Sequence, residues 1–378
     1  MSSVLMRVLV VGGGVMGLSS AWALARAGHE VELFDQDPIP NPRGSSFDQH
    51  RLIRYAYGER AGYTRMVAEA YRAWELVWED VGERLYAPTG TLVLATADEQ
   101  WAVASAAAAG ALGQPVRWLA PADLEPLFET SGLTRALHLD SGGVLLADRI
   151  LQALARHLGG RGVRMHAQDQ VATVDVERAR LQLADGRSVE ADRIVVAAGV
   201  WATRLLPELR DRVRASRQVL VYLDPPPALA PLWQRAPMVL DIDADAGFYL
   251  VPPVRGTRLK VGDHRFSLRG DPDGDRTATP AETHAVLDLC RDRLRRFEEY
   301  RVADTRVCFY TVAPDERFIV ELRGRGCIVS ACSGHAFKFG SIIGLAVAEA
   351  LEGRRDGAAL RRWAAGEEPE AATSVSAP

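Results

Sequence analysis

The apolar and polar positions at the start of the chain predict a strand, a tight turn, a helix and a second strand. Residues 6–11 are a largely apolar, β-branched run, and residues 12–17 are rich in glycine. Residues 18–27 have helical spacing and end at Gly28, a residue type that commonly ends helices. A second apolar run, 30–34, leads into Asp35. This order is typical of a parallel βαβ unit.

Farther along, the pattern indicates two kinds of region, one made mainly of strands and one in which strands and helices alternate. From about 217 to 311 short strands follow one another as in a β meander, broken by one helix that begins with a capping box at Thr279 and Glu282. Before and after this stretch, strands alternate with helices. The sequence therefore predicts an α/β chain with a second, interleaved β-sheet domain. Helices are expected at 66–81, 99–112, 148–158 and 341–351, and strands at 90–95, 163–165, 171–176, 193–199, 218–223, 238–242, 248–251, 258–261, 306–311, 318–322 and 327–330.

The glycine-rich run carries the strongest chemical signal. Gly12, Gly14 and Gly17 match G-x-G-x-x-G, follow a strand and open a helix. Such glycines let backbone N–H groups approach a pyrophosphate at the positive end of the helix, and Asp35 can accept ribose hydroxyls. The loop predicts a dinucleotide site without distinguishing FAD from NAD. The sequence has no second such loop, which a flavoprotein that also binds nicotinamide would usually show.

Composition narrows the class of protein. The 378 residues carry a formal charge of −4 with basic and acidic residues interspersed, which argues against nucleic-acid binding. No apolar run reaches the roughly 18 to 20 residues of a membrane span, and the first strand begins too early for a signal peptide. We therefore expect a cytoplasmic protein. The four cysteines are too irregularly spaced for a disulfide framework or a zinc site.

Lysine is scarce in this chain. Of 45 basic residues, all but Lys260 and Lys338 are arginine. If drift has replaced nearly every surface lysine with arginine, these two mark positions that require a compact ammonium group, although two lysines could also survive by chance.

Neither a calcium-binding loop nor a hydrolase signature is matched by the residues present. Residues 271–275, Asp-Pro-Asp-Gly-Asp, with Glu282 at the twelfth position, suggest a calcium loop. Arg276 occupies the sixth position, where such a loop needs glycine, and Glu282 serves the following helix. We predict a solvated turn and no metal site. Neither a G-x-S-x-G elbow nor an H-E-x-x-H helix supports hydrolase chemistry.

Three segments hold most of the reactive side chains. In 44–58, Arg51 and Arg54 are three apart and would share a helical face, which could also be a plain solvated face. In 259–264, Lys260 and His264 have an even spacing and would face the same side of a strand. In 332–340, Lys338 lies between two phenylalanines after a buried strand, an unlikely setting for a solvated side chain.

Taken with the βαβ loop, these segments resemble the monomeric sarcosine oxidase family. That family includes N-methyltryptophan and pipecolate oxidases, within the wider D-amino-acid-oxidase-like flavoproteins. The resemblance runs nearly end to end. Its further anchors are Arg-Leu-Ile-Arg-Tyr-Ala-Tyr-Gly-Glu at 51–59, Gly199-Val-Trp201, Leu259-Lys-Val-Gly-Asp-His264, Cys308-Phe-Tyr-Thr311, Pro314-Asp-Glu316 and Ser333-Gly-His-Ala-Phe-Lys338.

The resemblance implies FAD as the cofactor. Cys308 matches the cysteine that forms a thioether to the flavin 8α carbon, so it implies a covalent cofactor. The other positions that it implies for cofactor contact are Gly12, Gly14, Val15, Met16, Gly17, Asp35, Ser45, Arg51, Val171, Gly199, Gly334, His335, Phe337 and Lys338.

The same resemblance implies roles at the substrate end. Arg54 and Lys338 match a pair that grips a substrate carboxylate, and Lys260 matches the lysine that activates oxygen. A fixed positive charge there stabilises the anion formed when O₂ accepts an electron. Arg51 would lie against the flavin, and His264 and Tyr249 would line the pocket.

The expected protein is a two-domain flavoprotein. Its Rossmann-like FAD-binding domain would comprise 1–86, 145–215 and 315–367, and its mixed or antiparallel β-sheet substrate domain 87–144 and 216–314, with a disordered tail at 368–378. A monomer is expected, with an amino acid and O₂ as its small-molecule partners.

The expected reaction is oxidation of a secondary or N-methylated amino acid by hydride transfer to flavin N5. The imine then hydrolyses, and O₂ is reduced to H₂O₂. A tailoring oxidase or dehydrogenase acting on a larger amino-acid or cyclic imino-acid derivative is the alternative, and a non-catalytic FAD-binding protein is a third. Phe47, His50 and Cys332 depart from the family pattern, so we expect a reshaped pocket.

Overall fold

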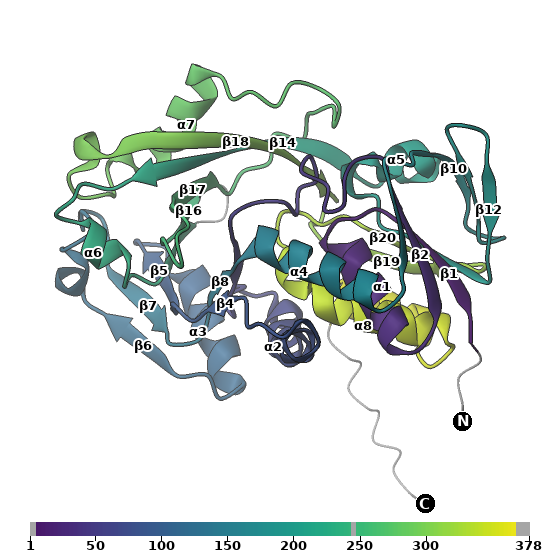
Figure 1. Cartoon of the computed structure of the whole chain (residues 1–378). Helices are drawn as coiled ribbons and strands as arrows, with labels where there is room; N and C mark the ends of the chain where they lie inside the picture. The colour runs from purple at the N-terminus through teal and green to yellow at the C-terminus, as the bar shows by residue number, and fades with distance from the viewer. Residues whose placement is uncertain (1–4, 243–246, 368–378) are drawn as a thin grey trace, which may run out of the picture.

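The structure is a computed structural model that describes residues 5–242 and 247–367 (Figure 1). The tail at 368–378, predicted to be disordered, lies outside the described residues. Two large sheets organise the described chain. Figure 1 shows one of them with its helices on the right and the other extending across the left and top of the molecule.

The first large sheet has six strands in the order β19-β20-β13-β1-β2-β9. All neighbouring strands are parallel except β19 and β20, which are antiparallel. Helices α1, α4 and α8 pack together beside this sheet (Figure 1). Their bounds, with those of the strands, are β1 Arg7–Val11, α1 Val15–Arg26, β2 Glu30–Asp35, α4 Ala147–Gly160, β9 Arg164–Ala167, β13 Arg193–Val196, β19 Ile319–Arg323, β20 Gly326–Ser330 and α8 Gly340–Leu351.

Both faces of this sheet are covered. Val8 and Val10 of β1 join a core cluster with residues of the three helices. Leu9 and Val11, which alternate with them, join a second cluster that includes residues of a small three-stranded sheet. Burial on both faces explains why β1 reads as a continuous apolar run. β1 ends at Val11, so the glycine loop begins directly after this buried strand.

The second large sheet has eight strands in the order β18-β14-β17-β16-β15-β5-β7-β6. Its neighbours are antiparallel except β5 and β15, which are parallel. Helix α7 packs against β14, β16 and β17, and α3 packs against β5, β6 and β7. The bounds are β5 Thr91–Ala95, α3 Gln100–Ala111, β6 Val116–Leu119, β7 Arg135–Leu139, β14 Arg214–Asp224, β15 Met238–Ile242, β16 Gly247–Val251, β17 Leu259–Asp263, α7 Pro280–Arg291 and β18 Arg301–Val312.

The remaining elements complete the described chain. They are β3 Arg51–Ile53, α2 Ala61–Val81, β4 Tyr86–Ala87, η1 Pro121–Leu124, β8 Gly143–Leu145, β10 Val171–Asp175, β11 Arg180–Leu183, β12 Ser188–Glu190, η2 Gly199–Trp201, α5 Ala202–Leu205, η3 Pro207–Leu209, α6 Ala230–Trp233, η4 Phe297–Glu299, η5 Phe337–Phe339 and α9 Gly357–Ala364.

The predicted α/β class, with a mixed sheet beside a Rossmann-like one, is confirmed. The predicted capping box is also present, because the Glu282 amide donates to Thr279 Oγ1 (3.2 Å) and the Thr279 amide donates to Glu282 Oε2 (2.8 Å). The six-stranded sheet draws its strands from the three ranges that we assign to the FAD-binding domain. The domain boundaries themselves stay a prediction.

Two local predictions were wrong. Arg51 and Arg54 do not share a helical face, because residues 51–53 form strand β3, which pairs antiparallel with β8. A spacing of three suits a helix, but pairing with a strand whose register partners are 90 to 94 positions away decides the conformation. The strand expected at 193–199 ends at Val196, and a 3₁₀ turn begins at Gly199.

Candidate functional site

One cavity is lined by the glycine loop and by residues at the ends of β1, β2 and β13. Most of the predicted cofactor-contact residues line it. They are Gly12, Gly14, Val15, Met16, Asp35, Ser45, Arg51, Val171, Gly199, Gly334 and Phe337. Residues far apart in the sequence thus meet along a single cavity, as a dinucleotide site requires.

Two of the predicted glycines are required by close backbone approach. Gly12 has φ +109°, and a Cβ there would lie 2.4 Å from the Ala197 carbonyl oxygen. A Cβ at Gly17 would lie 1.8 Å from the Gly12 carbonyl oxygen. Gly17 is not among the lining residues; it lets helix α1 approach the turn, so that Val15 and Met16 of the first helical turn line the cavity.

Asp35 lies at the end of β2, is buried and lines the cavity. Its carboxylate accepts hydrogen bonds from the Gly13 amide (2.6 Å), the Asp37 amide (2.9 Å) and Asn41 Nδ2 (2.9 Å). Burial raises its pKa, and these donors act in the opposite direction. A carboxylate offers about four acceptor positions, so one remains for a ribose hydroxyl.

Two hydroxyls that the sequence analysis missed also fit a bound dinucleotide. Thr311 Oγ1 and Ser330 Oγ are buried, line the cavity and have no hydrogen-bond partner within the described residues. Buried polar atoms are normally paired, so a ligand in this cavity would satisfy them. Thr311 ends the Cys308-Phe-Tyr-Thr311 anchor, to which the sequence analysis gave no hydroxyl role, and nothing in the local sequence marks Ser330.

A second cavity, of about 490 Å³, joins the first. Arg51, Tyr310, Gly334 and Phe337 line both, which places the junction at the ends of β3, β18 and η5. The second cavity has the volume of a small-molecule site. The predicted substrate-end residues that line it are Arg51, Arg54, Tyr249, Lys260, His264 and Lys338. His335, predicted to contact the cofactor, also lines this second cavity.

Arg54 and Lys338 are two buried cations on this second cavity, with exposed fractions of 9% and 4%. Lys338 Nζ donates to the Tyr57 hydroxyl (3.0 Å) and to the His335 carbonyl oxygen (2.9 Å). The Arg54 guanidinium lies 4.6 Å from the centre of the Tyr57 ring, and its NH1 has no hydrogen-bond partner among the residues that the structure describes. Within the described part of the chain, neither cation has a carboxylate at ion-pair distance. Burial lowers the pKa of both groups.

Lys260 is also fully buried, but it has a carboxylate partner. Its Nζ donates to Asp48 Oδ2 (2.9 Å) and to the His50 carbonyl oxygen (2.7 Å). The sequence analysis missed Asp48, which lies 212 positions from Lys260. Burial and the nearby Arg51 lower the pKa of Lys260, and the Asp48 carboxylate opposes them because it stabilises the ammonium.

His264 and Tyr249 line the second cavity, as expected. His264 directly follows the last residue of β17, so it lies just outside the strand. It nevertheless lines the same cavity as Lys260. Burial raises the pKa of Tyr249 to about 12, which keeps its phenol neutral at ordinary pH. Gly262 makes room for that ring, since a Cβ there would lie 2.3 Å from Tyr249 Cζ.

Cys308 is fully buried on β18. Tyr310, two residues on and therefore on the same strand face, lines both cavities, whereas Cys308 belongs to neither lining. Burial raises the pKa of its thiol, and the nearby cations Arg51, Arg306 and Lys260 lower it. The surroundings thus favour a thiolate more than burial alone would.

The departures from the family pattern lie mostly away from the cavities. His50 Nε2 is 2.8 Å from the Arg258 carbonyl oxygen, and Phe47 lies beneath the Arg306 guanidinium at 5.7 Å. Neither Phe47 nor His50 is among the residues lining the two cavities, so these two departures do not change either lining directly. Cys332 does line the cofactor cavity.

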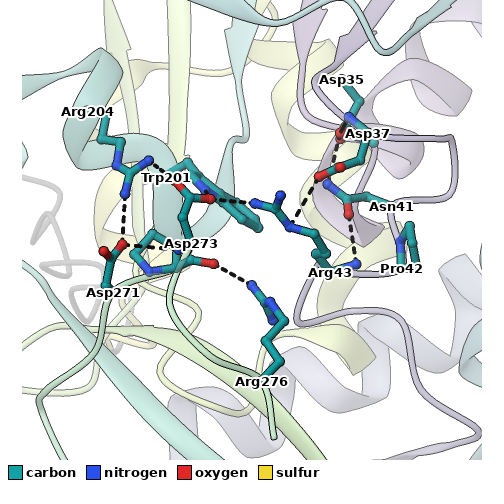
Figure 2. Close-up of polar contacts among 12 residues, drawn as sticks. Asp35, Asp37, Asn41, Pro42, Arg43, Trp201, Arg204, Asp271, Asp273 and Arg276 are labelled. Atoms are coloured by element: carbon teal, nitrogen blue, oxygen red, sulfur yellow. Dashed lines mark hydrogen bonds and ion pairs between the residues drawn. The ribbon is translucent and has the colours of Figure 1, made fainter.

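The turn at 271–275 is tied down by ion pairs, so the prediction of a simply solvated turn was incomplete (Figure 2). Asp273 pairs with Arg43 and Arg204 and accepts a hydrogen bond from Trp201 Nε1 (2.9 Å). Arg204 also pairs with Asp271 (2.8 Å). Trp201 and Arg204 line the cofactor cavity, so this turn packs beside it.

Across 5–242 and 247–367, no three His, Cys, Asp or Glu side chains are arranged to hold a metal ion. Over the same ranges, no helix combines the length and apolar character needed to cross a membrane.

Comparison with known proteins gives related sequences over most of the chain. A monomeric sarcosine oxidase from Bacillus sp. is 27% identical over 369 residues, covering 92% of this chain and 93% of that protein. An N-methyl-L-tryptophan oxidase from Citrobacter koseri is 26% identical over 374 residues, covering 92% and 95%. A solved structure of a modified fructosyl peptide oxidase from Aspergillus nidulans superposes with a TM-score of 0.79 at 22% identity, covering 95% and 93%.

The structural likeness, at that identity, supports the fold. The family is shown by the sequence, because residues 7–350 match the family model described as FAD dependent oxidoreductase. This match spans the glycine loop, both cavities and both lysines. The resemblance inferred from the motifs is therefore confirmed, and the chain belongs to the FAD-dependent oxidoreductases.

Proposed function

We propose that this protein is an oxidase of a secondary or N-methylated amino acid. The observation that carries the proposal is the pair of buried cations, Arg54 and Lys338, on a cavity that joins the cofactor cavity. A buried charge without a counter-charge is costly, and two adjacent ones of the same sign more so. A substrate carboxylate would pair with both, which is the recognition that an amino acid offers.

Bound FAD would supply the redox chemistry, taking a hydride from the carbon next to nitrogen and passing the electrons to O₂, with imine hydrolysis and H₂O₂ as outcomes. The protein's own part is to hold and orient the substrate. Arg54 and Lys338 fix the carboxylate, and Tyr249 and His264 line the cavity around the rest of the substrate. Lys260 supplies a fixed positive charge where oxygen is reduced.

The names of the related proteins support an amine substrate. Sarcosine and N-methyl-L-tryptophan both carry a carboxylate and a secondary amine, and the sequence relatives are oxidases of these compounds by name. A larger substrate than sarcosine is the second candidate. It is favoured by the cavity of about 490 Å³, whose lining includes Leu240, Trp101 and Phe266.

Anaerobic titration tests the proposal. Amines and amino acids of increasing size, from sarcosine to N-methylated aromatic and cyclic imino acids, are added to the protein without O₂. A substrate is expected to bleach the flavin absorption, and admitting O₂ is expected to restore it with formation of H₂O₂. If none of these compounds reduces the flavin, the amine oxidase proposal fails. Bleaching that O₂ does not reverse would point to a dehydrogenase.

The covalent link to Cys308 is part of the proposal. Acid-precipitated protein is expected to stay yellow, and Cys308→Ser is expected to release the colour into the supernatant. Cys332→Ser is the matched control, because that thiol lines the cofactor cavity, and its pellet should stay yellow. Colour released from the unchanged protein would contradict a covalent link, and colour retained by Cys308→Ser would move the link to another residue.

The remaining assignments of the proposal concern the whole protein. We assign 1–86, 145–215 and 315–367 to the FAD-binding domain and 87–144 and 216–314 to the substrate domain. The membership of the two large sheets supports this division. The protein is proposed to act as a monomer in the cytoplasm.

A further inference from the structure

Asp48 is a buried carboxylate that no part of the proposed reaction yet uses. It precedes β3, its side chain has 0% exposure, and it lies at ion-pair distance from Lys260. A carboxylate in such surroundings is tolerated only when it is paired and hydrogen-bonded.

Donors from three strands converge on this carboxylate. Lys260 Nζ of β17 lies 2.9 Å from Oδ2 and Arg51 of β3 pairs with the same oxygen, while the Tyr222 hydroxyl of β14 donates to Oδ1. The Gln49 amide adds a fourth donor at 2.7 Å. All its acceptor positions are therefore occupied.

The same contacts fix the Lys260 ammonium. Lys260 and Tyr222 are direct partners in the register of β17 and β14, and Asp48 bridges their two side chains. The ammonium has three N–H donors, of which Asp48 and the His50 carbonyl take two. Because Lys260 lines the second cavity, the third remains for a ligand there.

We propose that Asp48 is a positioning residue for the reduction of oxygen, holding the Lys260 ammonium in its charged form at the cavity. This inference rests on the proposed role of Lys260. The charged and titratable groups that face Lys260 are Asp48, His50 and Arg51 from the segment entering β3, Tyr222 from β14, Tyr249 from β16, and Arg306 and Cys308 from β18.

Asp48 opposes the other influences on the charge of Lys260. Arg51 and Arg306 repel an ammonium at Lys260, and burial disfavours its charge as well. Of the groups that face it, Asp48 supplies the carboxylate. Without that negative charge, the pKa of Lys260 falls, and its proton is lost at lower pH. Oxygen would then meet a neutral amine.

The experiment uses the holoprotein with Asp48→Asn, which keeps the shape of the side chain and removes its charge. The flavin is reduced with dithionite, and its reoxidation by O₂ is followed across pH. Reoxidation in the variant is expected to decline with rising pH at a midpoint at least about one unit below that of the unchanged protein. Above that midpoint the variant should be at least about tenfold slower, and lowering the pH should restore its rate.

A second readout needs no turnover. The absorption spectrum of the oxidised flavin is titrated in the variant, and a spectral transition is expected at the midpoint found for reoxidation, because the same ammonium loses its proton near the ring. Asp304→Asn is the matched control. It removes an exposed carboxylate opposite Tyr222 on β18, and the midpoint is expected to stay in place.

Combining Asp48→Asn with Lys260→Met tests the inference even if Asp48→Asn alone does not fold. The double variant lacks the ammonium that would otherwise be buried without its carboxylate. If Asp48 acts through Lys260, the double variant Asp48→Asn/Lys260→Met should reoxidise within about threefold of Lys260→Met alone. A double variant slower than that, or an Asp48→Asn profile that matches the unchanged protein, would overturn the inference.

Failure of the proposed role of Lys260 would give different results from failure of the proposed role of Asp48. If Lys260→Met alone leaves reoxidation unchanged, Lys260 does not activate oxygen, and the proposal about Lys260 is lost. If Lys260→Met slows reoxidation while Asp48→Asn leaves both the midpoint and the spectrum unmoved, the role of Lys260 stands and that of Asp48 is refuted.

Discussion

Replacing Lys260 with methionine is expected to slow reoxidation of the reduced flavin by O₂ about 10²- to 10³-fold. Lys260 is fully buried on the cavity that joins the cofactor site, and a fixed charge in such a place stabilises a developing anion without reorganising. Methionine has nearly the same length and no charge. Stopped-flow mixing of dithionite-reduced protein with O₂ measures the step without involving substrate.

Lys338→Met is the matched control, because Lys338 is the chain's other lysine and is buried on the same cavity. We expect the two variants to fail in opposite half-reactions. Lys338→Met should weaken reduction of the flavin by substrate and leave reoxidation within about threefold. Lys260→Met should leave substrate reduction much less affected. Equal losses of reoxidation in both variants would mean that general damage to the cavity, and not the charge at Lys260, governs reactivity with oxygen.

Replacing Arg54 with methionine is expected to lower kcat/KM about 10²- to 10³-fold for a carboxylate substrate. Removing one partner of a buried charge contact typically costs about 2–5 kcal/mol, and the Arg54 NH1 group has no other partner within the described residues. The loss should shrink when the substrate is an amide or ester of the same amine. Steady-state kinetics with both kinds of substrate measure the difference.

Arg60→Met is the control for this prediction. Arg60 lines the same cavity, but its side chain is 46% exposed and pairs with Glu316. Exposed ion pairs contribute little, so kcat/KM should stay within about threefold. A loss in Arg54→Met that is equally large for charged and uncharged substrates would contradict carboxylate binding by Arg54.

Much of the fold could be predicted because its signals are local. The glycine loop lies between β1 and α1, where the apolar run and the helical spacing predict it. The capping box at Thr279 and the apolar strand β13 are similarly readable over a few residues. Local reading failed at Arg51 and Arg54, where pairing with β8 overrode a spacing that suits a helix.

The candidate site was predictable only in part. The motifs named Arg54, Lys260 and Lys338, and the structure brings all three to one cavity. Asp48 carried no local signal, because an aspartate in a polar stretch is ordinary until a lysine 212 positions later is found beside it. The hydroxyls of Thr311 and Ser330 became informative only once burial removed water from them.

The sequence by itself determined the glycine loop, the α/β class, the family and thereby FAD. These depend on short sequence patterns whose physical meaning is local, such as the close backbone approach that requires glycine at position 12. The tertiary structure alone decided which charges are paired. Arg54 and Lys338 have no carboxylate partner within the described chain, while Lys260 has Asp48. The cost of a buried charge depends on which distant elements exclude water and which bring a counter-charge, and only the folded chain fixes both.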